Sequence, residues 1–434
     1  MGDDDDEFPP GREEAVFKRP EALIETNVAG MNVLGSIARH GGPEFEPYVD
    51  EALRALLNKS SHPEPTVKET IAELLPSLVD YCVREYEGGH IARVKDGENV
   101  HPIKEKTAST VYAVWTNLSM LVRDVNQSVV ERSCESGREV MEAVGPAGTR
   151  NGNFEVYLDS LIKLLQKQAP CSHYGDSVMA TNAYLLVAME FVLDLGKMLG
   201  SSIRSRHLSR IVIALQNLSQ DHNPMDERLQ SLAIMSHLVP AMGDAGFAYW
   251  KDIFSPVAMA AIEQECSRYP KSDVRLQRNG VCVLGVCCEQ YGESLADEYL
   301  AFLGRVMPLL DMKIPEDDPE EGVGACVDNA AACLCRMITA VPKQVPLDTT
   351  LPKLLRVLPL KRDFAECETV YGVILKLLEE EHPEIMSRTL EVKSIFDAAT
   401  EMDNEMEDGL KSRLKQASER LRKRKRTQDV ATVE

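Results

Sequence analysis

A helix-type apolar pattern recurs along the chain at an almost constant interval. Apolar residues at positions i, i+3, i+4 and i+7 form the buried stripe of an amphipathic helix. The chain contains seven such stripes: Val49/Ala52/Leu53/Leu56, Val111/Val114/Trp115/Leu118, Leu158/Leu161/Ile162/Leu165, Leu208/Ile211/Val212/Leu215, Phe254/Val257/Ala258/Ala261, Leu303/Val306/Met307/Leu310 and Leu351/Leu354/Leu355/Leu358. Successive stripes begin 46 to 50 residues apart, except for one interval of 62. This regularity indicates a repeat protein rather than a domain with a single core.

Each stripe is followed by a break and a second helical segment, so the predicted repeating unit is a helical hairpin. The second segments of neighbouring units align with one another, for example RLQ at 228–230 with RLQ at 275–277, an offset of 47 residues. This alignment places the small residues Ala233, Gly280 and Ala330 at equivalent positions. A small residue there allows the second helix to approach its neighbour closely, and the Asp and Arg at the helix start suit capping and ladder pairing between adjacent repeats.

The predicted fold is all-α: an α-solenoid of HEAT-type helical hairpin repeats forming a superhelix. No strand-type alternation of useful length competes with this prediction. We expect about seven to eight hairpins over residues 13–400, after an acidic N-terminal tail at 1–12 and before a charged C-terminal tail at 401–434. The long interval contains a polar stretch near 86–106, which we interpret as an inserted loop.

The charge balance restricts the possible partners. The chain has 48 Lys and Arg against 69 Asp and Glu, a net charge of −21, which disfavours direct binding of nucleic acid or of an anionic membrane and favours basic protein partners. The N-terminus begins MGDDDDEFPP, which is unlike a basic and apolar targeting peptide. We therefore expect a cytosolic or nuclear protein with reduced cysteines.

The cysteines and glycines do not indicate an enzyme or a metal protein. Cys282, Cys287 and Cys288 fall within seven positions, but a structural zinc site needs four ligands in short paired spacings. We predict that they are core residues of a second helix. The pair Cys171 and His173 lacks a third orienting group, and the chain has no phosphate-binding loop motif. No catalytic residue, cofactor or metal ion is predicted.

Acidic clusters are the candidate sites for a partner. The loop at 315–321 carries Glu316, Asp317, Asp318, Glu320 and Glu321 and is either a solvated linker or an electrostatic lure for basic proteins. Two aspartates at the start of second helices, Asp273 and Asp328, are further candidates, with capping or pairing between repeats as the alternative role.

The basic C-terminus reverses the acidic trend. Residues 411–426 carry nine Lys and Arg and one Glu. This segment is a nuclear-localisation-like sequence, an intramolecular partner of the acidic repeats or a solvated helical end.

The last repeats resemble a known family. The motifs are VRLQRNGVCVLGVCCEQYGE at 274–293, VDNAAACLCRMITAVP at 327–342, and LPL at 358–360 followed by DFAE at 363–366. In this order they resemble the importin-β-type karyopherins, and most closely the subgroup that imports ribosomal proteins and histones. The resemblance is good over 226–386 and thinner over 12–225.

The resemblance implies a nuclear transport receptor that binds basic cargo, nucleoporins and RanGTP and shuttles between cytoplasm and nucleus. Members of the family are about twice as long, so the chain is expected to represent a C-terminal half without the Ran-binding repeats. It also has only CSHYGDS, at 171–177, where relatives often carry a long acidic insertion. The alternative function is a HEAT-repeat scaffold or regulatory subunit of a protein complex.

Overall fold

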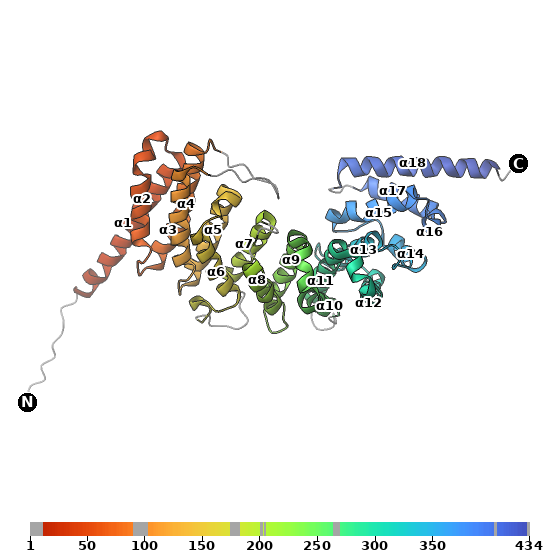
Figure 1. Cartoon of the computed structure of the whole chain (residues 1–434), viewed down its shortest axis with the longest axis horizontal. Coiled ribbons are helices and arrows are strands. Elements are labelled where there is room, and N and C mark those ends of the chain that lie inside the picture. The colour runs from red at the N-terminus through yellow and green to blue at the C-terminus, as the bar shows by residue number, and fades with distance from the viewer. Residues whose placement is uncertain are drawn as a thin grey trace, which may run out of the picture. The chain divides into compact units, whose positions relative to one another are not determined.

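The computed structural model describes residues 12–89, 103–173, 183–199, 203, 205–263, 270–402 and 406–431. Within those residues every regular element is a helix, which confirms the predicted all-α solenoid (Figure 1). The chain divides into two compact units, residues 1–214 and 215–434.

The first unit contains two layers of helices. Its helices are α1 (Arg12–His40), α2 (Val49–Lys59), α3 (Pro65–Tyr86), α4 (Glu105–Leu121), α5 (Gln127–Gly148), α6 (Gly152–Leu165), α7 (Ala183–Leu199) and α8 (Ser205–Leu218), of which α8 crosses into the second unit. The second helices α1, α3, α5 and α7 pack side by side in chain order, and the first helices α2, α4 and α6 form the other layer.

The second unit repeats this arrangement. Its helices are α9 (Met225–Met242), α10 (Ser255–Glu263), α11 (Pro270–Tyr291), α12 (Tyr299–Val306), α13 (Val323–Ala340), α14 (Leu347–Val357), α15 (Cys367–Glu379), α16 (Pro383–Met386), α17 (Thr389–Glu401) and α18 (Asp408–Ala431). The helices α9, α11, α13 and α15 pack side by side, and α10, α12 and α14 lie against them.

The apolar stripes read from the sequence are the buried faces of the first helices. Val49, Leu53 and Leu56 of α2 are buried, as are the corresponding residues of α4, α6, α8, α10 and α14. The exception is Met307, which is half-buried and lies just after the end of α12 at Val306. The helices therefore form where the spacing of apolar residues matches the helical period, and each buries its stripe against its neighbours.

Gly280 confirms the prediction of a close helix approach. A Cβ atom at this position would lie 2.8 Å from the Cβ atom of Ala261 and 2.9 Å from the carbonyl oxygen of Ala258, both on α10. Gly285, one turn further along α11, faces the next repeat, where the Cα atom of Cys333 would be 3.1 Å away. Small residues on α11 thus bring it close both to the first helix of its own hairpin and to α13.

We expect the Gly280→Ala variant to be less stable by about 1 to 3 kcal/mol, because the added methyl group overlaps α10. Thermal unfolding followed by circular dichroism measures this difference. The matched control is Gly304→Ala on α12, where no atom lies within 4 Å of the added Cβ atom. This control should be neutral or slightly stabilising, since alanine favours a helix over glycine. Equal stability of the two variants would contradict the close packing of α11 on α10.

Polar side chains link successive second helices. The Asn279 side-chain amide donates a hydrogen bond of 3.0 Å to the carbonyl oxygen of Leu229 on α9. Arg336 on α13 pairs through Nε with Glu289 of α11 at 2.9 Å and through Nη2 with Glu366, just before α15, also at 2.9 Å. Arg336 therefore joins three repeats, although it lies near the end of α13 and not at the helix start where such pairing was predicted.

Short 3-10 helices connect some second helices to the next first helix. In two of them, η4 (Gly243–Tyr249) and η6 (Gly292–Glu298), the first residue is a glycine with positive φ, 53° for Gly243 and 44° for Gly292. Glycine is suited to this conformation because it lacks a Cβ atom. The two glycines end α9 and α11 and turn the chain toward the following first helix.

The helix α13 is long and apolar enough, by length and composition alone, to cross a membrane. However, 78% of it is buried between the helices around it. This is the burial expected of a core helix in a helical array.

The structure modifies the predicted tail at 401–434 and leaves other predicted segments untested. The first half of α18 packs on α17 and α15, with Leu410 and Leu414 buried, and Arg413 pairs with Glu368 of α15 at 2.7 Å. That half is a second helix of the array rather than a tail, because it carries its own apolar stripe. The acidic residues 1–11 and most of the loop near 86–106, from 90 to 102, lie outside the described residues.

Candidate functional site

The acidic loop at 315–321 has two kinds of side chain. Glu316, Asp317, Glu320 and Glu321 are exposed. Asp318 is only 6% exposed, and its carboxylate accepts hydrogen bonds from the backbone N–H groups of Val323, at 2.9 Å, and Gly324, at 2.8 Å. Asp318 therefore caps the N-terminus of α13, and we remove it from the candidate partner-binding residues.

Asp328 is also an internal residue. It is 1% exposed, and its carboxylate accepts hydrogen bonds of 2.6 to 3.1 Å from the backbone N–H groups of Lys361, Arg362 and Asp363. Burial raises the pKa of Asp328, while these three backbone donors act in the opposite direction. Asp328 fixes the loop before α15 to α13, which is the structural alternative for this residue. The side chain of Asp273 lies outside the described residues, so its role remains a prediction.

A second set of acidic residues lies on the second helices of the first unit. The residues are partly or fully exposed and belong to three adjacent helices: Glu69, Glu73 and Asp80 of α3, Glu131, Glu135, Glu139 and Glu142 of α5, and Glu190 and Asp194 of α7. We call this set the acidic face. The four glutamates of α5 are spaced four, four and three residues apart, so they form one line along the helix.

The carboxylates of the acidic face influence one another. Burial raises the pKa of Glu131, and Glu135 and Glu69 raise it further. Burial also raises the pKa of Glu139; Arg132 opposes this, and Asp80 on α3 is the largest of the acidic contributions that add to it. The charged forms therefore repel one another across the α3 and α5 boundary. A cation placed among them would relieve this repulsion.

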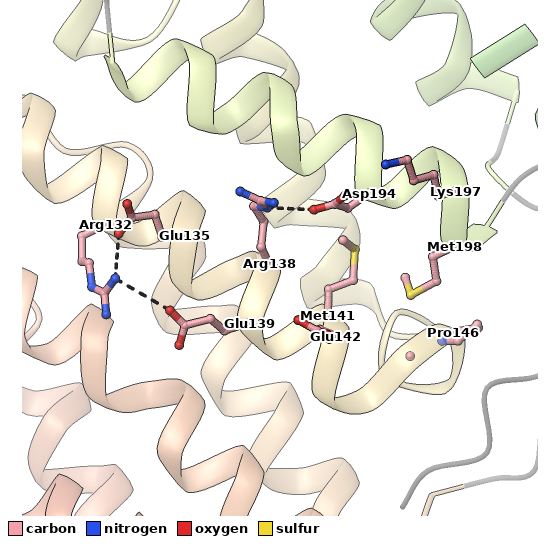
Figure 2. Close-up of a pocket in the computed structure, with 11 residues that line it drawn as sticks. Arg132, Glu135, Arg138, Glu139, Met141, Glu142, Pro146, Asp194, Lys197 and Met198 are labelled. Atoms are coloured by element: carbon pink, nitrogen blue, oxygen red, sulfur yellow. Dashed lines mark hydrogen bonds and ion pairs between the residues drawn. The ribbon is translucent and has the colours of Figure 1, made fainter. Parts of the chain in front are cut away.

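A groove of about 860 Å³ lies along the acidic face between α5 and α7. Figure 2 shows Arg132 directed at Glu135 and Glu139, and Arg138 directed at Asp194. The Arg132 Nη1 atom is 2.7 Å from Glu135 Oε2, and the Arg138 Nε atom is 2.8 Å from Asp194 Oδ2. The Arg138 pair links α5 to α7, whereas the Arg132 pair lies within α5.

One end of the groove is shaped by a kink in α5 and is lined by apolar side chains together with Glu142 and Lys197. Met141, Pro146 and Met198 lie there together in Figure 2. The kink occurs at Gly145, which has φ 55° and ψ −157°, a conformation open to glycine alone. Pro146 reinforces it, because the residue before a proline is driven away from the helical conformation. The groove thus combines carboxylates and thioether side chains with three cationic residues, Arg132, Arg138 and Lys197.

This combination suits a basic side chain with an aliphatic stem. The methylene groups of a lysine or arginine can lie on the methionines while the charged end reaches the carboxylates. Sequence reasoning missed the acidic face because it searched for consecutive acids. The helical spacing of Glu131, Glu135, Glu139 and Glu142 is the signal that would have revealed it.

The cysteines behave as the sequence predicted. Cys287 and Cys288 are fully buried, and Cys282 is half-buried. Burial raises the pKa of the Cys288 thiol to about 12 and that of Cys287 well above its usual value. Across the part of the chain that the structure describes, no group of three His, Cys, Asp or Glu residues could hold a metal ion.

Comparison with curated proteins gives two importins. The chain is 26% identical over 190 residues to a probable importin subunit beta-4 from Schizosaccharomyces pombe, a match that covers 44% of this chain and 16% of the relative. It is 21% identical over 371 residues to importin-4 from Mus musculus, covering 84% of this chain and 32% of the relative. No family model matches the sequence. The chain spans a third or less of the length of these relatives.

Comparison with solved structures gives the karyopherin Kap121p. The structure of Kap121p bound to the SUMO protease Ulp1p has a TM-score of 0.62 with 14% identity and covers 92% of this chain and 35% of that one. Kap121p bound to RanGTP has a TM-score of 0.59 with 13% identity and covers 91% of this chain and 34% of that one. This similarity confirms the fold.

The relatives named by these comparisons are importins, which agrees with the prediction that the chain is not an enzyme. In sequence the chain is similar to importins, and in fold it is similar to the karyopherin Kap121p, as the motifs of its last repeats predicted.

Proposed function

We propose that the chain forms part of a nuclear transport receptor and that the acidic face holds basic segments of its cargo. The observation that carries this proposal is the line of carboxylates on α3, α5 and α7 beside a groove that also holds the side chains of Met141 and Met198. Ribosomal proteins and histones have the matching chemistry, since they are rich in lysine and arginine. The relatives support the transport role, because they are importins.

The proposal includes the partners that such a receptor needs. Structures of Kap121p contain Pho4p, Ulp1p or Ste12p, the nucleoporin Nup53p, or RanGTP. By analogy we propose basic cargo, nucleoporins and RanGTP as partners of this protein and shuttling between cytoplasm and nucleus as its localisation.

The test is the binding of a fluorescein-labelled, lysine-rich histone or ribosomal-protein segment, measured by fluorescence anisotropy. The titration is carried out at about 0.05 and 0.15 M salt, where screening of exposed charges differs. We expect tighter binding at the lower salt concentration. RanGTP is added in a parallel titration, and release of the segment would show that this part of the chain also responds to Ran. Absence of binding at both salt concentrations would favour the scaffold function.

The exposed loop acids are expected to act on the association rate. Neutralising Glu316, Asp317, Glu320 and Glu321 together should slow association of the basic segment by about threefold to tenfold at low salt and flatten its salt dependence, because the lost charges act at long range. Stopped-flow fluorescence measures both quantities. Unchanged rates at low salt would rule out a steering role for this loop.

A further inference from the structure

Arg138 of α5 is held by two carboxylates of the neighbouring second helix, α7. Its Nε atom is 2.8 Å from Asp194 Oδ2, and its Nη1 atom pairs with Glu190 Oε2. Glu190 and Asp194 are four residues apart, so successive turns of α7 present them to α5. Figure 2 shows Arg138 directed from α5 at Asp194. The two carboxylates thus form a site that one guanidinium group fills.

The geometry of this site suits a guanidinium group better than an ammonium group. The Nε and Nη1 atoms belong to one planar group with fixed donor directions, and each of them meets a different carboxylate. A lysine ammonium group is a compact, strongly hydrated charge whose donors are not fixed in this way. An arginine from a bound segment could therefore make the same two ion pairs as Arg138, whereas a lysine matches the site less well.

The ion pairs of Arg138 are of the kind that exchanges readily. The side chains of Arg138, Glu190 and Asp194 are 35%, 45% and 34% exposed, and ion pairs with this much exposure contribute little to stability. Other carboxylates lie on the same helix as Arg138: Glu135 three residues before it and Glu142 four residues after it, and both line the groove. A displaced Arg138 side chain therefore has carboxylates within the groove to turn toward.

We propose that Glu190 and Asp194 form an arginine-binding site, which Arg138 occupies in the free protein and an arginine of a basic partner takes over on binding. The inference rests on the proposed function of the acidic face and names the side chain that one part of this face selects. Arg138 is then an internal competitor of the partner. It lowers the apparent affinity because the site is open to the partner in only a fraction of the molecules.

The probes are two fluorescein-labelled peptides of equal length and charge, in which serine alternates with arginine or with lysine. They are titrated with the full chain in fluorescence anisotropy at about 0.05 M salt, where exposed charges are weakly screened. The Arg138→Gln variant should bind the arginine peptide about fivefold more tightly than the unchanged protein does, because an exposed ion pair no longer competes. The lysine peptide should gain less, about twofold.

Two further variants separate this competition from a general effect of charge. Adding Glu190→Gln/Asp194→Asn to the Arg138→Gln variant removes the site, so the gain in affinity should disappear. Arg54→Gln takes the same charge from an exposed side chain of α2 and should leave the affinity for both peptides unchanged. If Arg138 served only to join α5 to α7, its removal would weaken binding rather than strengthen it.

Four results would overturn the inference: weaker or unchanged binding of the arginine peptide by Arg138→Gln, an equal gain for the lysine peptide, an equal gain in Arg54→Gln, or a gain that persists without Glu190 and Asp194. Failure of the proposed function is seen separately, as the absence of binding of either peptide to the unchanged protein. The arginine site then stands only if Arg138→Gln binds the arginine peptide, and it fails as well if no variant binds.

Discussion

The Asp328→Ala variant is expected to lower the free energy of unfolding by about 3 kcal/mol, a large part of the stability of a protein. The reason is the number of groups that depend on one carboxylate. The backbone N–H groups of Lys361, Arg362 and Asp363 all donate to it, and it is buried. Alanine would leave these donors without their common acceptor and would leave a gap at a buried position of α13.

The loss of stability in the Asp328→Ala variant should be local at first, because each repeat contacts only its neighbours. Hydrogen exchange is expected to accelerate in α13, α14 and α15 before it does so in the first unit. Urea unfolding followed by circular dichroism gives the overall loss. The control is Asp317→Ala in the exposed loop, which should change stability by no more than about 0.5 kcal/mol. If Asp328→Ala unfolds at the same urea concentration as the unchanged protein, Asp328 does not hold this loop.

Neutralising the acidic face should weaken the binding of basic segments without a loss of stability. The variant Glu73→Gln/Asp80→Asn/Glu139→Gln removes three negative charges that interact across α3 and α5. We expect the affinity for a lysine-rich segment to fall by about tenfold, which corresponds to roughly 1.4 kcal/mol. Anisotropy titration at low salt measures this change.

The stability of the same variant follows from the sign of the pKa shifts. The pKa values of Asp80 and Glu139 are raised in the folded protein, mainly by burial. The folded state therefore binds these protons more tightly than the unfolded state does, so stability increases as the pH falls through the raised pKa values and is lost as the pH rises. At neutral pH the neutral variant should melt at the same or a slightly higher temperature.

A control with the same change in net charge completes this test. The variant Glu293→Gln/Asp297→Asn/Asp348→Asn alters exposed acids of the second unit and should leave affinity unchanged within about twofold. If both triple variants weaken binding equally, the net charge of the chain matters and the acidic face does not.

The sequence was sufficient for the architecture because the determining signal is local and repeated. A stripe such as Leu351/Leu354/Leu355 needs only helical spacing to be recognised, and its burial follows from the neighbouring repeat. The same holds for Gly280, whose alignment with Ala233 and Ala330 indicated a crowded position. The sequence likewise predicted the burial of Cys287 and Cys288, because they occupy apolar positions of a second helix.

The sequence was not sufficient for the connections or for the acidic face. The 3-10 segments that follow Gly243 and Gly292 depend on single residues with positive φ, although their offset of 49 residues matches the repeat. The acidic face arises from residues such as Asp80 and Glu139, which are 59 positions apart in the sequence and come together only when α3 packs on α5. The role of Asp318 was hidden for a related reason, since an acid in a polar loop can equally cap the next helix.

The buried cysteines give this array a set of natural reporters. Thiols lie in α3, α5, α11, α13 and α15, for example Cys82, Cys134, Cys287, Cys333 and Cys367, and burial raises the pKa of each. A buried thiol with a raised pKa does not react with an alkylating reagent until its helix opens. The order in which these cysteines become alkylated under mild denaturation therefore records, repeat by repeat, where the array opens first.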